Sequence, residues 1–133
     1  ILILGFANLF ADGFSMAVSN YLSTQSRNDL EKKNTTKKPI KSALATFVSF
    51  LIMGFIPLLI FVLVAVTESV ALKNQQFLYA IILTAISLLI IGYLKGTVTN
   101  KHKLKSSIET LIIGGIASLL AYYVGYLLKV LVG

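Results

Sequence analysis

Residues 42–66, SALATFVSFLIMGFIPLLIFVLVAV, contain no charged side chain. A helix that crosses the hydrocarbon core of a bilayer needs about 20 such residues. Three further apolar blocks lie at about residues 1–24, 77–94 and 108–132. A soluble chain of 133 residues, 56% of them hydrophobic, could not bury four such blocks without lipid. We therefore predict an all-α fold, a polytopic membrane helix bundle, with residues 1–133 forming a single transmembrane domain.

The net charge of +7 is concentrated between the apolar blocks. The loop at about residues 25–41 carries six Lys or Arg residues, the loop at about 67–76 carries only Lys73, and the loop at about 95–107 carries four lysines. The positive-inside rule places the first and third loops in the cytoplasm, so the first block enters from outside. Because the sequence opens on Ile1 within an apolar run, we expect a further helix upstream, which makes these four helices part of a bundle of five.

Several classes of function are excluded or disfavoured by composition. The chain has no cysteine and one histidine, His102, which lies in a basic loop; this excludes disulfides, thiolate ligands and a His-based metal site within one chain. The sequence contains no Ser/His/Asp set, no phosphate-binding glycine loop and no paired acids suited to hydrolysis. We therefore expect no enzyme activity and no bound cofactor. Since the basic residues report topology, we expect the lipid bilayer as partner and no nucleic acid.

The first apolar block carries a polar stripe. In GFANLFADGFSMAVSNYLSTQS (residues 5–26), Asn8, Asp12 and Met16 are spaced four apart, which places them on one face of a helix. Three more polar residues are predicted to share this face: Ser19, Asn20 and Ser23. A carboxylate at the centre of a membrane helix costs about 2.5–3.5 kcal/mol by insertion scales, and such acids usually mark ion or proton pathways.

Two interpretations of this stripe remain open from spacing alone. Asp12 and Met16 offer a hard oxygen beside a soft sulfur, a pair that suits a borderline divalent ion such as Fe²⁺. Alternatively, Asp12 is protonated and only hydrogen-bonds another helix. A metal site would also need a second helix or a second copy of the chain, since bound ions typically take about four or more ligands.

Three stretches resemble the vacuolar iron transporter family, including its bacterial and plant nodulin-like members. ANLFADGFSMAVSNYLSTQS resembles the second transmembrane helix of that family, SALATFVSFLIMGFIPLLIF its third and GGIASLLAYYVGYLL its last. The resemblance implies a five-helix fold that dimerises, with a path for Fe²⁺ or Mn²⁺ along the subunit interface and proton antiport. The helix that carries the family's key aspartate would precede Ile1.

The resemblance also assigns roles to residues of the stripe. Met16 matches the family's pathway methionine, and Asp12 matches a polar position on the same helix. Asn8 stands where better-studied members have a glutamate, and Asn20 where many have the glutamate of a GEY motif; these amides would weaken affinity for a cation. The short lysine-rich loop at residues 25–41 differs from the Glu- and Met-rich cytoplasmic domain of iron-storing members, so we expect that domain to be absent.

These observations lead to one hypothesis with two alternatives. The chain is expected to move Fe²⁺ or Mn²⁺ out of the cytoplasm in exchange for protons, with Asp12, Met16 and Asn8 as metal-binding residues at a homodimer interface. The alternatives are a scaffold that transports nothing and an exporter of another solute on the same fold. We expect an integral membrane protein of a bacterial inner membrane or, alternatively, of a vacuolar membrane.

Overall fold

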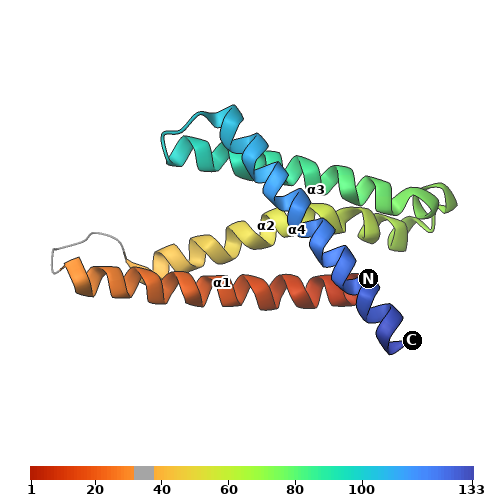
Figure 1. The fold of residues 1–133 in the computed structure, drawn as a ribbon, viewed down its shortest axis with the longest axis horizontal. Helices are drawn as coiled ribbons and strands as arrows, with labels where there is room; N and C mark the ends of the chain where they lie inside the picture. The colour runs from red at the N-terminus through yellow and green to blue at the C-terminus, as the bar shows by residue number, and fades with distance from the viewer. Residues whose placement is uncertain (32–37) are drawn as a thin grey trace. The chain divides into compact units, whose positions relative to one another are not determined.

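The computed structural model describes residues 1–31 and 38–133, which form four helices (Figure 1). The helices are α1 (Leu2–Glu31), α2 (Pro39–Thr67), α3 (Val70–Val98) and α4 (Lys103–Val132). They include 93% of the described residues, among which there is no strand. Each helix is long and apolar enough to cross a membrane. The prediction of an all-α membrane fold is confirmed.

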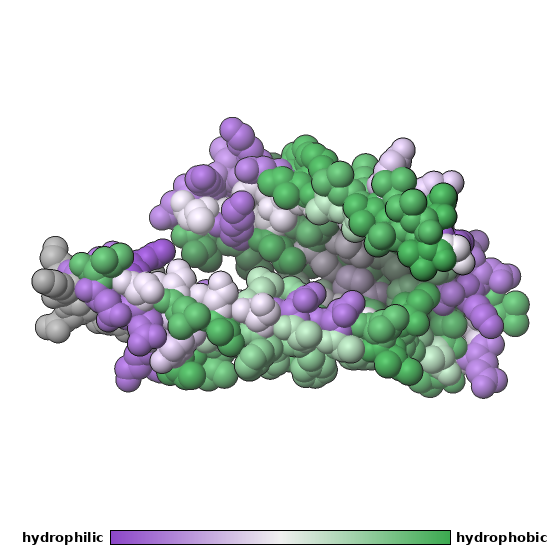
Figure 2. Space-filling view, turned by 60° about the horizontal axis from the view of Figure 1, so that its bottom comes forward, coloured by the Kyte–Doolittle hydropathy of each residue, from purple (hydrophilic) through white to green (hydrophobic). Residues whose placement is uncertain are grey.

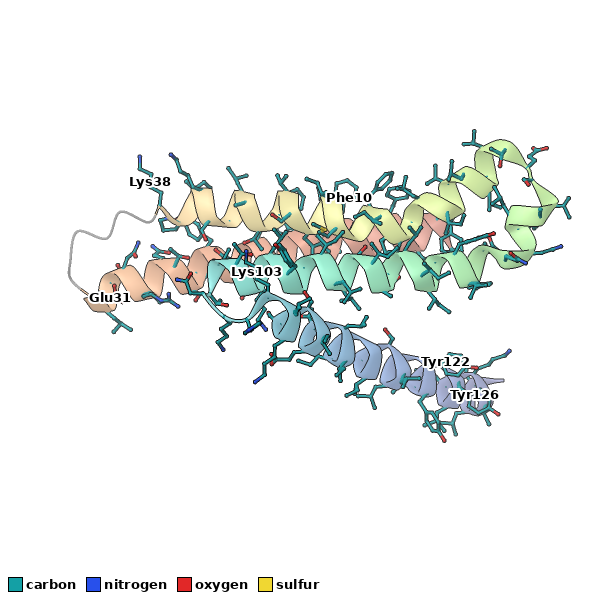
Figure 3. The ribbon with its side chains drawn as sticks, turned by 90° about the horizontal axis from the view of Figure 1, so that it is seen from above. Phe10, Glu31, Lys38, Lys103, Tyr122 and Tyr126 are labelled. Carbon is teal, nitrogen blue, oxygen red and sulfur yellow. The ribbon has the colours of Figure 1, made fainter. Side chains whose placement is uncertain are left out.

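The surface of the molecule agrees with a lipid environment. Figure 2 shows apolar side chains over most of the visible surface, whereas hydrophilic side chains gather mainly near the ends of helices. Tyr122 and Tyr126 lie exposed near the C-terminal end of α4 (Figure 3). Amphipathic rings of this kind favour the boundary between lipid and water.

The helices extend beyond the apolar blocks, so the predicted loops were too long. Only residues 68–69 separate α2 from α3, and residues 99–102 separate α3 from α4. Lys, Gln and Glu are good helix formers, so a helix continues after its apolar stretch has ended. Hydropathy therefore marks the depth of a segment in the membrane and not the end of its helix. In the predicted loop at 25–41, residues 25–31 are helical, and residues 32–37 lie outside the described residues.

The chain divides into two compact units, Ile1–Ile81 and Ile82–Gly133, and each is described by itself. In the first unit α1 packs along α2. Gly13 is buried there, and a Cβ on it would lie 3.1 Å from the Phe50 ring and 3.3 Å from the Phe47 ring. The missing side chain thus makes room for two aromatic rings of α2. Leu9 packs in the same way against Gly54 of α2.

In the second unit the end of α3 and the start of α4 form a tight hairpin. Gly92 is buried, and a Cβ placed on it would lie only 2.5 Å from Cα of Ser107. The buried Ser107 hydroxyl lies 3.2 Å from the carbonyl oxygen of Leu89 and 3.0 Å from that of Lys103, and it donates to these acceptors. Small residues commonly allow such close backbone approach between membrane helices.

Candidate functional site

The predicted site residues Asn8, Asp12 and Met16 all lie on the exposed side of α1. Met16 retains 46% of its surface. The buried residues of the same helix, Leu9 and Gly13, face α2 instead. Figure 2, in which α1 has come to the front, shows hydrophilic side chains in the middle of this helix between apolar ones. We call Asn8, Asp12 and Met16 the α1 stripe.

The three residues of the α1 stripe are spread along the helix axis and do not gather at one point. An α-helix rises about 1.5 Å per residue, so neighbouring stripe residues are about 6 Å apart along the axis and the whole stripe is about 12 Å long. Oxygen ligands hold divalent ions at about 2.0–2.6 Å. Asn8 and Asp12 offer two side-chain oxygen atoms, and Asp12 and Met16 offer an oxygen and a sulfur.

The stripe does not complete a coordination shell. Among residues 1–31 and 38–133, no three His, Cys, Asp or Glu side chains lie close enough together to hold a metal ion. Within the part of the chain that the structure describes, the Asp12 carboxylate has no hydrogen-bond partner. A metal bound to this carboxylate would need further ligands from outside α1.

Asn20, which the sequence prediction placed on the same face as Asp12, is partly buried against α2 instead of lying on the exposed side of α1. Its side-chain oxygen accepts a hydrogen bond of 2.6 Å from the Ser42 hydroxyl of α2, and both residues are partly buried. The structural interpretation that we considered for the stripe thus applies to Asn20, which links two helices.

Ser42 is the residue that sequence reasoning missed at this contact. It begins an apolar block, and a single serine there carries no signal of its own. Ser19 and Ser23, by contrast, are exposed on α1.

The profile of the VIT family matches residues 1–38 and 31–126, which include the whole α1 stripe. The chain belongs to the VIT family. This confirms the resemblance noted from the sequence. The curated relatives that match the chain are named as transporters.

The relatives of this VIT-family chain are similar over most of its length. It is 33% identical over 91 residues to vacuolar iron transporter 1 of Oryza sativa subsp. japonica, a match that covers 68% of this chain and 34% of that protein. It is 35% identical over 96 residues to the vacuolar iron transporter of Toxoplasma gondii, covering 71% of this chain and 32% of that protein.

A longer match is to vacuolar iron transporter homolog 4 of Arabidopsis thaliana, at 28% identity over 129 residues, covering 86% of this chain and 61% of that protein. No solved structure matches the chain. The matched segments correspond to about a third of the length of the rice and Toxoplasma relatives.

Proposed function

We propose that this VIT-family chain forms part of a transporter that moves divalent metal, Fe²⁺ or Mn²⁺, out of the cytoplasm. The observation that supports this most strongly is the exposed position of Asp12 on a membrane-length helix, with Asn8 and Met16 one turn to either side. The relatives named as iron transporters add the class of cargo.

A carboxylate on this face is not suited to contact with lipid. Insertion of an acid at a helix centre costs about 2.5–3.5 kcal/mol, and α2 does not cover Asp12. Water, a cation or another protein surface must therefore meet this side of α1. A second copy of the chain would bring a second α1 stripe and raise the number of stripe residues from three to six, enough for the four or more ligands that a metal ion takes. We propose a homodimer for this reason.

The same carboxylate provides a way to couple metal to protons. Asp12 accepts either a metal ion or a proton, so arrival of one releases the other. Metal that leaves the cytoplasm can then be exchanged for protons that enter it. By the positive-inside rule the C-terminal ends of α1 and α3 face the cytoplasm. The membrane would be a bacterial inner membrane or a vacuolar membrane.

Uptake into inside-out vesicles that contain the native polypeptide tests this proposal. With an acidic lumen, we expect Fe²⁺ or Mn²⁺ to accumulate well above the level in protein-free vesicles, since metal enters as protons leave. A protonophore should abolish the accumulation. Empty vesicles and vesicles with equal pH on both sides are the controls.

The alternatives predict different results in the same vesicles. A scaffold would assemble normally and accumulate no metal at any pH gradient. An exporter of another solute would release protons only when that solute is added and would ignore both metals. Either result, with correctly assembled protein, would contradict metal transport.

A further inference from the structure

The second unit carries a cluster of basic residues at the start of α4. Lys101, His102, Lys103 and Lys105 lie within five positions and are all exposed, and no acidic residue occurs between Glu68 and Glu109. The Lys103 ammonium lies 5.2 Å from the centre of the Tyr93 ring, a cation–π contact. Tyrosine side chains favour the membrane interface, so this contact indicates that the cluster lies at headgroup depth.

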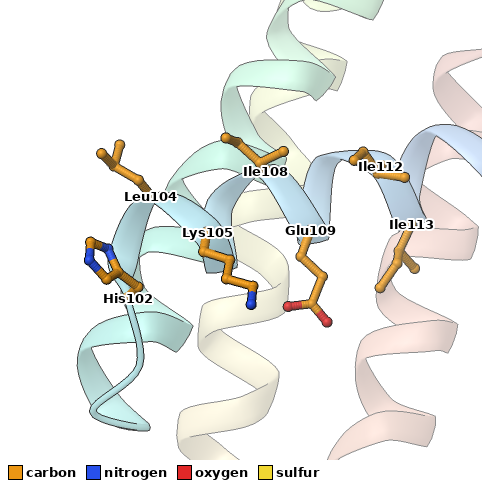
Figure 4. A pocket seen from close by; sticks show the side chains of 7 residues that line it. All are labelled: His102, Leu104, Lys105, Ile108, Glu109, Ile112 and Ile113. Atoms are coloured by element: carbon orange, nitrogen blue, oxygen red, sulfur yellow. The ribbon is translucent and has the colours of Figure 1, made fainter.

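A shallow groove of about 630 Å³ runs from this cluster along the first turns of α4 (Figure 4). Its lining is almost entirely apolar, and the charged ends of only a few side chains border it, with His102 and Lys105 nearest to the basic cluster. The residues that line it are His102, Leu104, Lys105, Ile108, Glu109, Ile112 and Ile113. From Lys105 to Ile113 the helix rises by about 12 Å, which takes the groove from headgroup depth into the hydrocarbon.

We propose that this groove binds one anionic phospholipid of the cytoplasmic leaflet, with its phosphate at Lys105 and His102 and an acyl chain along Ile108 and Ile112. This site is separate from the α1 stripe and does not depend on metal transport.

The two ends of the groove together favour a lipid as occupant. The basic end matches the charge of a phosphate, and basic residues near the cytoplasmic surface attract anionic lipids. The aliphatic wall matches an acyl chain, because α4 is a membrane-spanning helix whose outer surface faces hydrocarbon. A free phosphate ion would use only the basic end and leave the wall without a partner.

Glu109 allows a test that depends on whether lipid binding becomes stronger or weaker. Its carboxylate lies one turn after Lys105, and both side chains project to the same side of α4 (Figure 4). A carboxylate there opposes the attraction that Lys105 exerts on a phosphate. Removing the Glu109 charge should therefore strengthen lipid binding, whereas removing the Lys105 charge should weaken it.

A tryptophan reporter can measure occupancy, since the chain contains no tryptophan. Ile112→Trp would place an indole in the groove, with Ile113→Trp as a second reporter in case the first disturbs folding. The protein would be reconstituted in nanodiscs with brominated phosphatidylglycerol or brominated phosphatidylcholine at equal mole fraction. We expect roughly fivefold preferential quenching by the anionic lipid, the effect of about one basic residue at an anionic surface.

Four further variants distinguish a defined lipid-binding site from general attraction of anionic lipid to the basic surface. Lys105→Gln should remove most of the preference and Glu109→Gln should increase it. Lys101→Gln, which neutralises a lysine outside the groove, should change it little, and a Leu127→Trp reporter near the C-terminal end of α4 should show no preference. Equal quenching by both lipids, equal losses in Lys101→Gln and Lys105→Gln, or displacement of the lipid by millimolar inorganic phosphate would each overturn the proposal.

Discussion

Asp12→Asn is expected to reduce the rate of Fe²⁺ or Mn²⁺ uptake into inside-out vesicles by roughly 100-fold or more. The substitution preserves the shape of the side chain and removes the single charge of the α1 stripe. Loss of even an outer-shell partner of a metal ligand typically costs roughly 10–100-fold in affinity or activity. A neutral amide also cannot exchange a metal ion for a proton, so the remaining uptake should no longer respond to the pH gradient.

A matched control for this experiment lies on the same helix. Asp29 is exposed in the last turn of α1, beyond the apolar block, and Asp29→Asn should leave uptake within about twofold of the unmodified protein, as expected for a surface charge. Assembly of both variants would be compared by size-exclusion chromatography. Normal uptake by a correctly assembled Asp12→Asn protein would contradict the assignment of Asp12 to the path.

Gly92→Val should destabilise the hairpin of α3 and α4 by about 3 kcal/mol or more, at the upper end of the usual cost of overpacking. A Cβ at this position would lie 2.5 Å from Cα of Ser107 and 2.8 Å from the carbonyl oxygen of Ser106. Both are backbone atoms, so no side-chain rotation can relieve the clash and the two helices must separate. The change should appear as a lower unfolding temperature in detergent and a lower yield of folded protein.

Gly115 and Gly125 provide controls on the same unit. No heavy atom lies within 4 Å of a Cβ placed on either residue. Because glycine within a helix is less favourable than alanine by roughly 0.5–1 kcal/mol, Gly115→Ala and Gly125→Ala should be neutral or slightly stabilising. Equal unfolding temperatures for Gly92→Val and Gly115→Ala would show that the close approach of α3 to α4 does not exist in the protein.

Hydropathy predicts the four membrane-length helices, but it does not predict where each helix ends. Residues 42–66 contain no charged side chain. A membrane-spanning helix keeps such a segment out of water and still satisfies its backbone hydrogen bonds. Helix ends depend on local backbone geometry, as at Glu68, whose left-handed conformation (φ 49°) ends α2. Hydropathy carries no information about such a residue.

The candidate site, too, could be predicted from the sequence only in part. Spacing alone could place Asn8, Asp12 and Met16 on one side of α1, and the structure agrees. Spacing could not tell that Asn20 would face α2, because this depends on the position of Ser42, 22 residues later in the chain. Nor could it tell which side of α1 would pack against α2. That choice follows from Gly13 and Gly54, which let side chains of the opposite helix approach closely.

Reaction of a cysteine at position 12 with a membrane-impermeant thiol reagent tests the central claim most directly. The chain has no cysteine of its own, and such reagents attack thiolates, which form readily only in contact with water. Asp12→Cys is predicted to react rapidly in intact vesicles, while Phe14→Cys, exposed at nearly the same depth on the apolar side of α1, should not react. If the cysteine at position 12 stays as unreactive as the one at position 14, the stripe faces no aqueous path and the account is wrong.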